Sequence, residues 1–357
     1  MVKSIVRDIL IVLGITLMVL STSRTAMELI SNKRDDSRWW GTYQCSNGDL
    51  VSMSYLDNTH FRRIRDNNFP KPTYTGPKNT NVYLTGDSYT RGVRDTLLAG
   101  VCNFYHHSRY KNNLYYKLDK TKKNLLFIEI TERDVRDYFN EIRITEEIAD
   151  SSKLQGKTTK ISAYNATTHY AALPSLSIDD LFNKYINQNL QCNLFNYNFF
   201  MPLFETKAAF NYVFFSRASG DVVISKDKKF LFLKETVMPE GTHSSYSKLT
   251  QEEVNHLADN LNKVYDHFKA EGFTEVYLSV IPNTATIMQP EGYNNLIPLL
   301  YGNPQLRMKI IDVYSVFKKD PEGNYFNSGD THWNKKGFLV WLDMVNNIII
   351  DADSGGK

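Results

Sequence analysis

The chain has 357 residues, of which 42% are hydrophobic and 23% charged, so it can bury one large core or a core with a small appendage. Its 42 basic and 39 acidic residues leave a formal net charge of +3, which favours neither a nucleic-acid partner nor a strongly acidic one. No Walker-type loop and no G-x-G-x-x-G motif occurs, so nothing in the sequence supports nucleotide binding.

Residues 1–25 have the features of an export signal. Lys3 and Arg7 precede an uncharged run over 9–23. The length of this run lies between the roughly 7 to 15 residues of a signal-peptide core and the about 20 residues of a membrane span, and no A-x-A-like cleavage site follows it. We therefore predict an uncleaved membrane anchor, with the rest of the chain in the periplasm or outside the cell. A cleaved signal peptide is the alternative.

Three cysteines are scattered along the chain, at Cys45, Cys102 and Cys192. None of them is spaced as the ligands of a zinc site are, and no C-x-x-C motif occurs. In an oxidising compartment one pair could form a disulfide and leave the third thiol free. The sequence does not decide which pair this would be.

Residues 26–77 are predicted to form a polar neck followed by an irregular segment. The turn-forming sequence Asn47-Gly48-Asp49 falls within it, and three prolines over 70–77 favour an extended, loop-like end. No apolar run of strand or helix length stands out here, so the folded domain is expected to begin after this segment.

Over 78–350 the chain alternates between apolar strands and amphipathic helices. One helix should begin at a capping box formed by Thr250 and Glu253 and end near Gly272, and a last helix should cover 335–349. Continuous apolar strands separated by such helices indicate a mostly parallel sheet covered on both faces, which is an α/β three-layer sandwich. The buried strands are predicted at 81–85, 125–130, 275–281 and 308–313.

An insertion is predicted at about 150–245, where this alternation stops. Its residues are mainly Thr, Asn, Lys and aromatics, with strand-like pieces at 210–215, 221–225 and 230–233. We expect the insertion to pack beside the sheet and to contribute a small β element.

The tripeptide Gly86-Asp87-Ser88 comes directly after the first predicted strand. A serine at the carboxyl end of a parallel strand stands where α/β proteins bind their ligands. If a helix begins just after Ser88, its free N–H groups point at the space above the hydroxyl and could stabilise an oxyanion there. Ser88 is therefore a candidate nucleophile, and a plain helix N-cap is the other interpretation.

The tripeptide Asp330-Thr331-His332 lies just before the last predicted helix. An Asp two residues before a His can accept the imidazole Nδ1–H, which leaves Nε2 free to take the proton of Ser88. Asp330 and His332 could also be two ligands of a metal site, but no third ligand with suitable spacing is apparent. We therefore predict a triad of Ser88, His332 and Asp330, with no metal and no cofactor.

These two motifs resemble the SGNH (GDSL) hydrolase superfamily, which carries a glycine-aspartate-serine after its first strand and an Asp-His pair before its last helix. The sequence Asp-Thr-His-Trp at 330–333 is similar to the cell-envelope branch that includes alginate O-acetyltransferase subunits and DHHW-type proteins. The segments 130–133 and 280–291 are similar to that branch as well. The resemblance covers about 81–345 and implies an SGNH-like catalytic domain.

Four residues around the predicted triad are further candidates for the oxyanion or substrate site. Gly86 permits a tight turn before the serine, and Tyr89 and Trp333 flank the triad as candidates for the pocket wall or for core aromatics. Arg133 stands at the end of the second predicted strand, where the resemblance would place a Gly-x-Asn-Asp block. It could contact an acyl oxygen or a sugar carboxylate, and an ion pair with a neighbouring acid is the alternative. Gly100 is the nearest match to the superfamily's second-block glycine.

The function expected from this resemblance is O-acyl transfer, most readily of acetyl groups, to an envelope or exported polysaccharide. Ser88 would carry the acyl group, and His332 would activate the acceptor hydroxyl. A carbohydrate esterase or deacetylase is the first alternative, because it shares the same acyl-serine step. A non-catalytic carbohydrate-binding subunit is the second. Transfer would also imply a multispanning membrane partner that delivers the acyl group.

Overall fold

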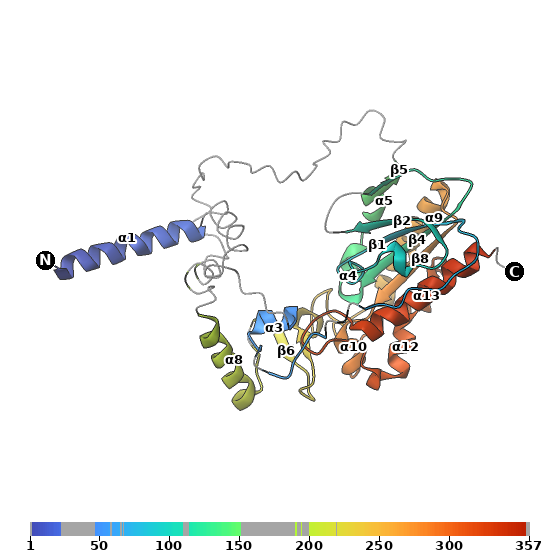
Figure 1. Cartoon of the computed structure of the whole chain (residues 1–357). Coiled ribbons are helices and arrows are strands. Elements are labelled where there is room, and N and C mark those ends of the chain that lie inside the picture. Colours follow the sequence, from blue (N-terminus) through green and yellow to red (C-terminus); the bar gives the residue numbers. More distant parts are fainter. Residues whose placement is uncertain are drawn as a thin grey trace. The chain divides into compact units, whose positions relative to one another are not determined.

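The computed structural model describes residues 2–22, 47–57, 59–64, 66, 68–109, 114–150, 190, 194, 200–218 and 220–354 (Figure 1). The chain divides into two compact units, the first made of 1–46, 55–59 and 159–216, and the second of 47–54, 60–158 and 217–357. Cys45 and Cys192 lie outside the described residues, so the disulfide prediction falls there, and Cys102 is an exposed free thiol.

A sheet of five strands forms the centre of the described part of the second unit (Figure 1). The spatial order is β2-β1-β4-β8-β9, and every neighbouring pair is parallel. The strands are β1 (Thr80–Gly86), β2 (Val101–Ser108), β4 (Lys123–Thr131), β8 (Glu275–Ile281) and β9 (Lys309–Ile310). Two short pairs lie apart from it: parallel β3 (Leu114–Tyr116) with β5 (Ile148–Asp150), and antiparallel β6 (Val222–Ile224) with β7 (Leu231–Leu233).

Helices flank this sheet, so the predicted α/β three-layer sandwich is confirmed. Helix α13 (Lys335–Asp353) packs on β1 and β4 and contacts α12 (Val313–Lys319). Helix α9 (Gln251–Glu271) packs on β8 and contacts α5 (Ile144–Glu147) and α11 (Leu296–Tyr301). The shorter helical elements are α3 (Asp49–Ser54), η1 (Asp95–Leu97), α4 (Glu132–Tyr138), η3 (Lys234–Thr236), α10 (Thr284–Met288) and η4 (Pro321–Gly323).

Helix α9 forms where the capping pattern predicts it. The Thr250 hydroxyl accepts the N–H of Glu253, and Gly272 ends the helix with a φ of 108°. That backbone conformation is left-handed, and glycine adopts it without a side-chain clash. The face turned to the core carries the buried residues Val254, Leu257, Leu261, Val264 and Phe268, which recur at helical spacing.

One strand prediction within the insertion is wrong. Residues 210–215 belong to helix α8 (Met201–Phe215), which has Pro202 in its first turn and ends at Ser216 in a left-handed conformation. The aromatic end of this segment favours a strand when taken alone. The preceding residues 205–209 are mainly good helix formers, and the helix, which begins at Met201, continues through them into the aromatic end.

Two other expectations for short strands have different outcomes. The pieces at 221–225 and 230–233 pair as the hairpin β6–β7, as the predicted small β element requires. The strand expected at 308–313 is shorter, because Asp312 caps α12 by accepting the N–H of Ser315 and thereby ends the extended segment. Most of the insertion, over 151–199, lies outside the described residues.

Helix α1 (Val2–Thr22) belongs to the first unit. It begins ahead of the apolar run and includes both Lys3 and Arg7. Over Lys3–Thr22 it is long and apolar enough to cross a membrane by length and composition, and among the described helices it is the one that meets this test. This is compatible with the predicted anchor.

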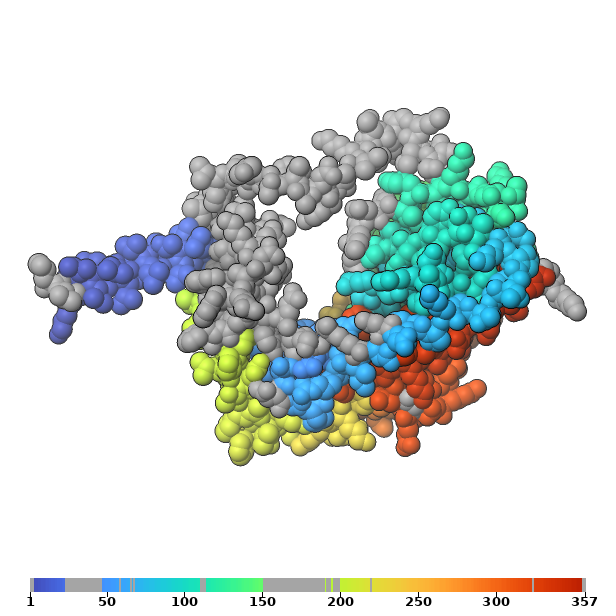
Figure 2. Space-filling model, viewed as in Figure 1, coloured from blue at the N-terminus to red at the C-terminus, as the bar shows by residue number. Residues whose placement is uncertain are grey.

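Residues 47–54 and 60–77 belong to the same compact unit as the α/β domain, so no boundary separates them from it at 78. Toward residue 77 this segment runs along α13, and Figure 2 shows its blue surface beside the red C-terminal helix. The Asp353 carboxylate accepts hydrogen bonds from the Tyr74 hydroxyl at 2.7 Å and from the Asn79 N–H at 2.6 Å. Residues 26–46 of the predicted neck lie outside the described residues.

Candidate active site

Ser88 follows β1 at a point where the sheet order reverses. In chain order the strands of the sheet read 2-1-3-4-5, so β2 lies on one side of β1 and β4 on the other. Ligands of open α/β sheets bind at the carboxyl ends of the strands at such a switch point. Ser88 therefore stands where this topology places a ligand.

No helix begins directly after Ser88, and residues 88–92 form turns and a bend. The N–H of Tyr89 donates to Asp87 Oδ1 at 2.8 Å, which is a local side-chain turn. Within the described residues the Ser88 N–H donates to no other group. It is therefore a donor beside the hydroxyl that could meet an oxyanion.

The side chains of Ser88, His332 and Asp330 lie in one hydrogen-bonded line. His332 Nε2 is 2.7 Å from Ser88 Oγ, although 244 positions separate the two residues, and His332 Nδ1 is 2.5 Å from Asp330 Oδ1. With its proton on Nδ1, the imidazole donates to Asp330 and accepts the Ser88 hydroxyl. This direction lets Nε2 take the serine proton.

Asp330 is held by donors on both carboxylate oxygens. The His332 N–H donates to Oδ1 at 2.9 Å, and the Asp49 N–H and the Arg63 guanidinium donate to Oδ2 at 3.2 and 3.3 Å. Burial by itself would raise the pKa of Asp330, but the hydrogen bonds from His332 and the charges of His332 and Arg63 lower it below its usual value. Asp330 thus stays ionised, as it must to stabilise an imidazolium.

Asp49 is a second carboxylate at the triad that the sequence did not indicate. It lies at the start of α3, and its oxygens accept the Thr331 N–H at 2.8 Å and the Thr331 hydroxyl at 2.5 Å. Asp49 Oδ2 is also 3.8 Å from His332 Nδ1. Asp49 therefore fixes the residue between Asp330 and His332 and places a negative charge near the imidazole.

Asp49 also supplies the third ligand that the metal interpretation lacked. Ligand atoms of Asp49, Asp330 and His332 lie within 4.8 Å of one another, a grouping that could hold a cation. The same atoms, however, already accept or donate the hydrogen bonds that join Thr331, His332 and Asp330. A cation could bind only if these hydrogen bonds were broken, whereas the triad arrangement keeps all of them.

Tyr89 and Trp333 form one wall beside the imidazole. The Tyr89 ring lies 4.8 Å from the His332 ring and 5.3 Å from the Trp333 ring, and its hydroxyl donates to the Thr331 carbonyl. Burial raises the pKa of Tyr89 well above its usual value, so the phenol remains a donor. Both rings are buried, and both also line the pocket in front of Ser88.

Beneath the serine turn lies a buried charged cluster. Glu129 Oε2 accepts the Asp87 N–H at 2.9 Å, and Arg109 pairs with the Asp87 carboxylate at 3.3 Å. Burial raises the pKa of Glu129 well above its usual value, and the charge of Asp87 adds to the effect. A Cβ at Gly86 would lie 2.4 Å from Thr90 Oγ1 and 2.5 Å from Glu129 Oε2, so glycine is the residue that fits there.

Two of the sequence candidates, Arg133 and Gly100, do not line the pocket of Ser88. Arg133 Nε is 4.0 Å from Asp134 Oδ1, which is the ion pair given as the alternative, and Arg133 is not among the residues that line the pocket of Ser88. Gly100 precedes β2, whose other end pairs with Gly86. It therefore lies at the amino end of the sheet, away from Ser88, and the second-block assignment is wrong.

The sequence missed Asp49, Arg63 and Glu129 as residues of this site. Glu129 had a readable signal, since a carboxylate inside the apolar run over 125–130 has to be explained by a buried partner. Asp49 and Arg63 had none, because they meet Asp330 only through the folding of a segment some 270 to 280 positions away.

The pocket in front of Ser88 and His332 has a volume of about 320 Å³. Its rim is basic, with Arg63, Arg91 and Lys335, of which Lys335 pairs with Asp66 at 2.7 Å. This volume is at the lower end of small-molecule sites, which suits an acyl group and its immediate surroundings. Protein-family models, curated proteins and solved structures give no match to this chain, so the functional argument depends on the geometry of the site and on its motifs.

Proposed function

We propose that this protein is a serine O-acyltransferase, most readily an O-acetyltransferase, that acts on an envelope or exported polysaccharide. The observation that carries the proposal is the line of hydrogen bonds from Ser88 Oγ through His332 to Asp330, at 2.7 and 2.5 Å. The resemblance of the Asp-Thr-His-Trp sequence at 330–333 to alginate O-acetyltransferase subunits supports transfer to a sugar.

In the first half-reaction, His332 Nε2 takes the hydroxyl proton as Ser88 Oγ attacks the carbonyl carbon of the acyl donor. The oxyanion that forms accepts the Ser88 N–H. The bond to the donor's leaving group then breaks, and the leaving group departs with the proton that His332 returns. Ser88 is left as an ester.

In the second half-reaction, His332 takes the proton of an acceptor hydroxyl, whose oxygen attacks the acyl carbon. The bond between the acyl carbon and Ser88 Oγ breaks, and Oγ receives the proton from His332. One acyl group has moved from donor to acceptor with no net change in protons. Asp330 keeps the imidazole oriented and stabilises its cationic form in both halves.

A carbohydrate esterase is the second candidate. The side chain of His332 is 19% exposed and lines the pocket of Ser88, so water can enter the site and serve as the acceptor in the second half-reaction. Both candidates share the acyl-serine, and only the product distinguishes them.

The test uses the full-length protein in detergent with a chromogenic acetyl ester. Turnover should fall at least about 10³-fold in Ser88→Ala and in His332→Ala. Ser108→Ala is the matched control, since Ser108 ends the neighbouring strand β2, and it should retain full turnover. Mass spectrometry of an oligosaccharide incubated with an acetyl donor then separates transfer from hydrolysis. If no ester is turned over in a Ser88-dependent manner, a non-catalytic glycan-binding subunit becomes the better proposal.

We further infer that α1 anchors the protein in a membrane and that the second unit faces the periplasm or the exterior. The length and apolar composition of Lys3–Thr22 support the anchor. An acyl group used outside the cytoplasm has to be delivered there, so transfer calls for a multispanning membrane partner.

A further inference from the structure

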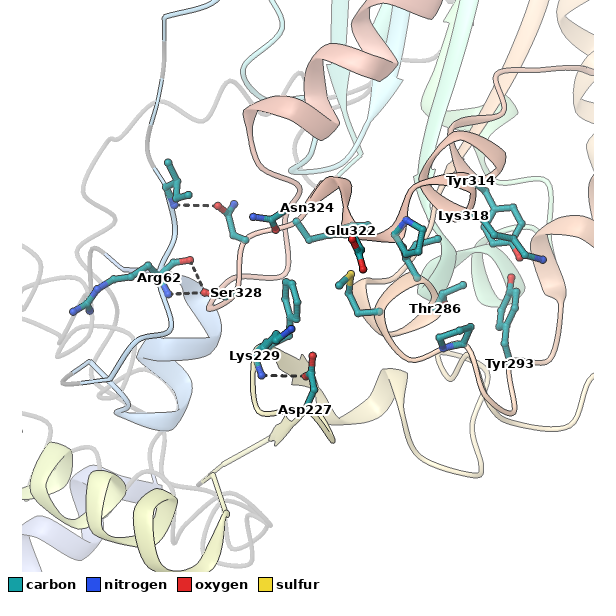
Figure 3. A pocket seen from close by; sticks show the side chains of 18 of the residues that line it. Arg62, Asp227, Lys229, Thr286, Tyr293, Tyr314, Lys318, Glu322, Asn324 and Ser328 are labelled. Carbon is teal, nitrogen blue, oxygen red and sulfur yellow. Dashed lines mark hydrogen bonds between the residues drawn. The ribbon is translucent and has the colours of Figure 1, made fainter.

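A second, larger hollow lies next to the pocket of Ser88. It has a volume of about 1120 Å³, and we call it the large groove (Figure 3). Its walls come from five places: the segment at 60–64, the turn of the β6–β7 hairpin, the segment that follows β8, helix α12, and the loop that leads into the triad. Figure 3 shows Asp227 and Lys229 on the hairpin, Thr286 and Tyr293 after β8, Tyr314 and Lys318 on α12, and Asn324 and Ser328 on the loop.

The large groove and the pocket of Ser88 share two lining residues, Ile64 and Asn327. These two residues lie between the two hollows, and we call them the ridge. They are joined to each other, since the Ile64 N–H donates to Asn327 Oδ1 at 3.0 Å. Asn327 Nδ2 in turn donates to the carbonyls of His332 and Trp333 at 3.3 and 3.0 Å. A ligand that crosses this ridge therefore passes from the large groove directly to the catalytic histidine.

The lining of the large groove combines aromatic rings with polar groups of both charges. The aromatic rings of the lining are buried and belong to Phe230, Tyr293, Tyr314 and Phe326. The charged side chains are exposed and belong to Arg62, Lys229, Lys318, Asp227 and Glu322. A lining that combines ring carbons with many donors and acceptors suits a ligand with apolar C–H faces and many hydroxyls. An acyl chain offers no donor or acceptor to these charged groups.

We propose that the large groove binds an extended oligosaccharide segment of the acceptor, and that one sugar of this segment crosses the ridge of Ile64 and Asn327 to present its hydroxyl to Ser88. This inference rests on the proposed acyl transfer and adds to it where the acceptor binds and that several consecutive sugars are recognised. The volume supports several sugars, since it exceeds the roughly 300 to 1,000 Å³ of sites for single small molecules.

Binding is measured on full-length Ser88→Ala protein in detergent, which keeps the groove and cannot turn over the ligand. The probes are two series, neutral hexose oligosaccharides and hexuronate oligosaccharides, each from the monosaccharide to the hexasaccharide. Affinity should rise with chain length in at least one series, because each added sugar occupies more of the groove. Adding Lys229→Ala and Lys318→Ala together should weaken the longest bound oligosaccharide about tenfold.

The matched control adds Lys226→Ala and Lys319→Ala, which lie on the same hairpin and the same helix but do not line the groove. It should bind as the parent does. With Ser88 present, neither double variant should alter hydrolysis of a small chromogenic ester, because the groove lies outside the pocket of Ser88.

The outcomes for the two proposals are separable. If the small ester is hydrolysed in a Ser88-dependent manner but no oligosaccharide binds, or affinity does not depend on chain length, the groove inference is overturned and the acyl chemistry stands. If long oligosaccharides bind and Lys229→Ala with Lys318→Ala weakens them, but no ester is turned over, the groove inference stands and the proposed enzyme activity fails. Equal weakening by the control pair would also overturn the inference.

Discussion

The Asp49 carboxylate accepts both the N–H and the hydroxyl hydrogen of Thr331, at 2.8 and 2.5 Å, across a sequence separation of 282 residues. Thr331 lies between the base and the acid of the proposed triad, so Asp49 controls the backbone from which both project. Its Oδ2 is also 3.8 Å from His332 Nδ1, close enough to favour the imidazolium that the proposed reaction would form.

We expect Asp49→Asn to lower kcat/KM about tenfold, because the amide keeps a hydrogen bond to Thr331 but removes the charge. Without that charge the cationic intermediate of the proposed reaction is less stable, so the loss should fall on kcat. Asp49→Ala should cost more, since Thr331 also loses its acceptor. Steady-state kinetics measure both effects. The exposed Asp95→Asn is the charge-matched control, and an unchanged kcat in Asp49→Asn would limit Asp49 to a structural role.

Gly86→Ala should destabilise the fold by about 1 to 3 kcal/mol and impair catalysis. The added Cβ would lie 2.5 Å from Glu129 Oε2 and 2.4 Å from Thr90 Oγ1, and both of these atoms are buried beneath the serine turn. Gly92→Ala is the control on the same turn, because no atom lies within 4 Å of a Cβ there. Thermal unfolding of the two variants compares them. Equal melting temperatures would contradict the tight packing of Gly86.

Much of this fold could be predicted from the chain because its signals are local. The apolar runs predicted β1, β4 and β8, and the capping box predicted α9. Both signals are local, since buried strands and helix caps depend on residues that are neighbours in the sequence. Helix α8 was missed because its aromatic end is strand-like when considered apart from the residues before it. Local sequence patterns could not predict the large groove, because its walls come from five separate segments.

The candidate site, like the fold, has a part that local sequence predicts and a part that it does not. Local sequence was enough to indicate the two tripeptides that carry the proposed triad, Gly86-Asp87-Ser88 and Asp330-Thr331-His332. The parallel sheet brings both of them to one edge. The support around them comes from distant segments that carry no motif. Arg63 was assigned to an irregular neck, yet its guanidinium donates to Asp330 at 3.3 Å.

Glu129→Gln should change how stability depends on pH. A carboxyl whose pKa is raised on folding adds stability that is fully present below its usual pKa and is lost as pH rises through its folded pKa. Wild-type protein should therefore lose free energy of unfolding toward alkaline pH, by up to about 1.4 kcal/mol per pH unit for one proton. Glutamine can still accept the Asp87 N–H but binds no proton, so this loss should be smaller.

Denaturant unfolding from about pH 5 to about pH 8 measures this difference. The exposed Glu240→Gln serves as the control and should follow wild type at each pH. Parallel curves for wild type and Glu129→Gln would mean that Glu129 takes up no proton in this range.

Asp330→Asn should lower kcat about 10⁴-fold while the fold is retained, because an amide does not hold the imidazole in the tautomer that frees Nε2 as a base. The same variant should alter stability in acid. The folded pKa of Asp330 is lowered, so its contribution to stability is present above its usual pKa and is lost as pH falls through the folded value. The stability deficit of the variant should therefore shrink as pH falls, which denaturant unfolding measures. A deficit that stays constant into acid would contradict the ionised, hydrogen-bonded Asp330.

Deletion of residues 2–22 tests the anchor, and ester hydrolysis by the truncated protein can still be measured. The full chain should sediment with membranes and resist extraction by high salt, because a helix as apolar as Lys3–Thr22 is held by hydrophobic burial and not by charge. The truncated chain should be soluble and should keep Ser88-dependent ester hydrolysis, since Ser88, His332 and Asp330 all lie in the second unit. N-terminal sequencing of the full-length product separates the two export models. A mature chain that begins after the apolar run would replace the anchor with a cleaved signal peptide.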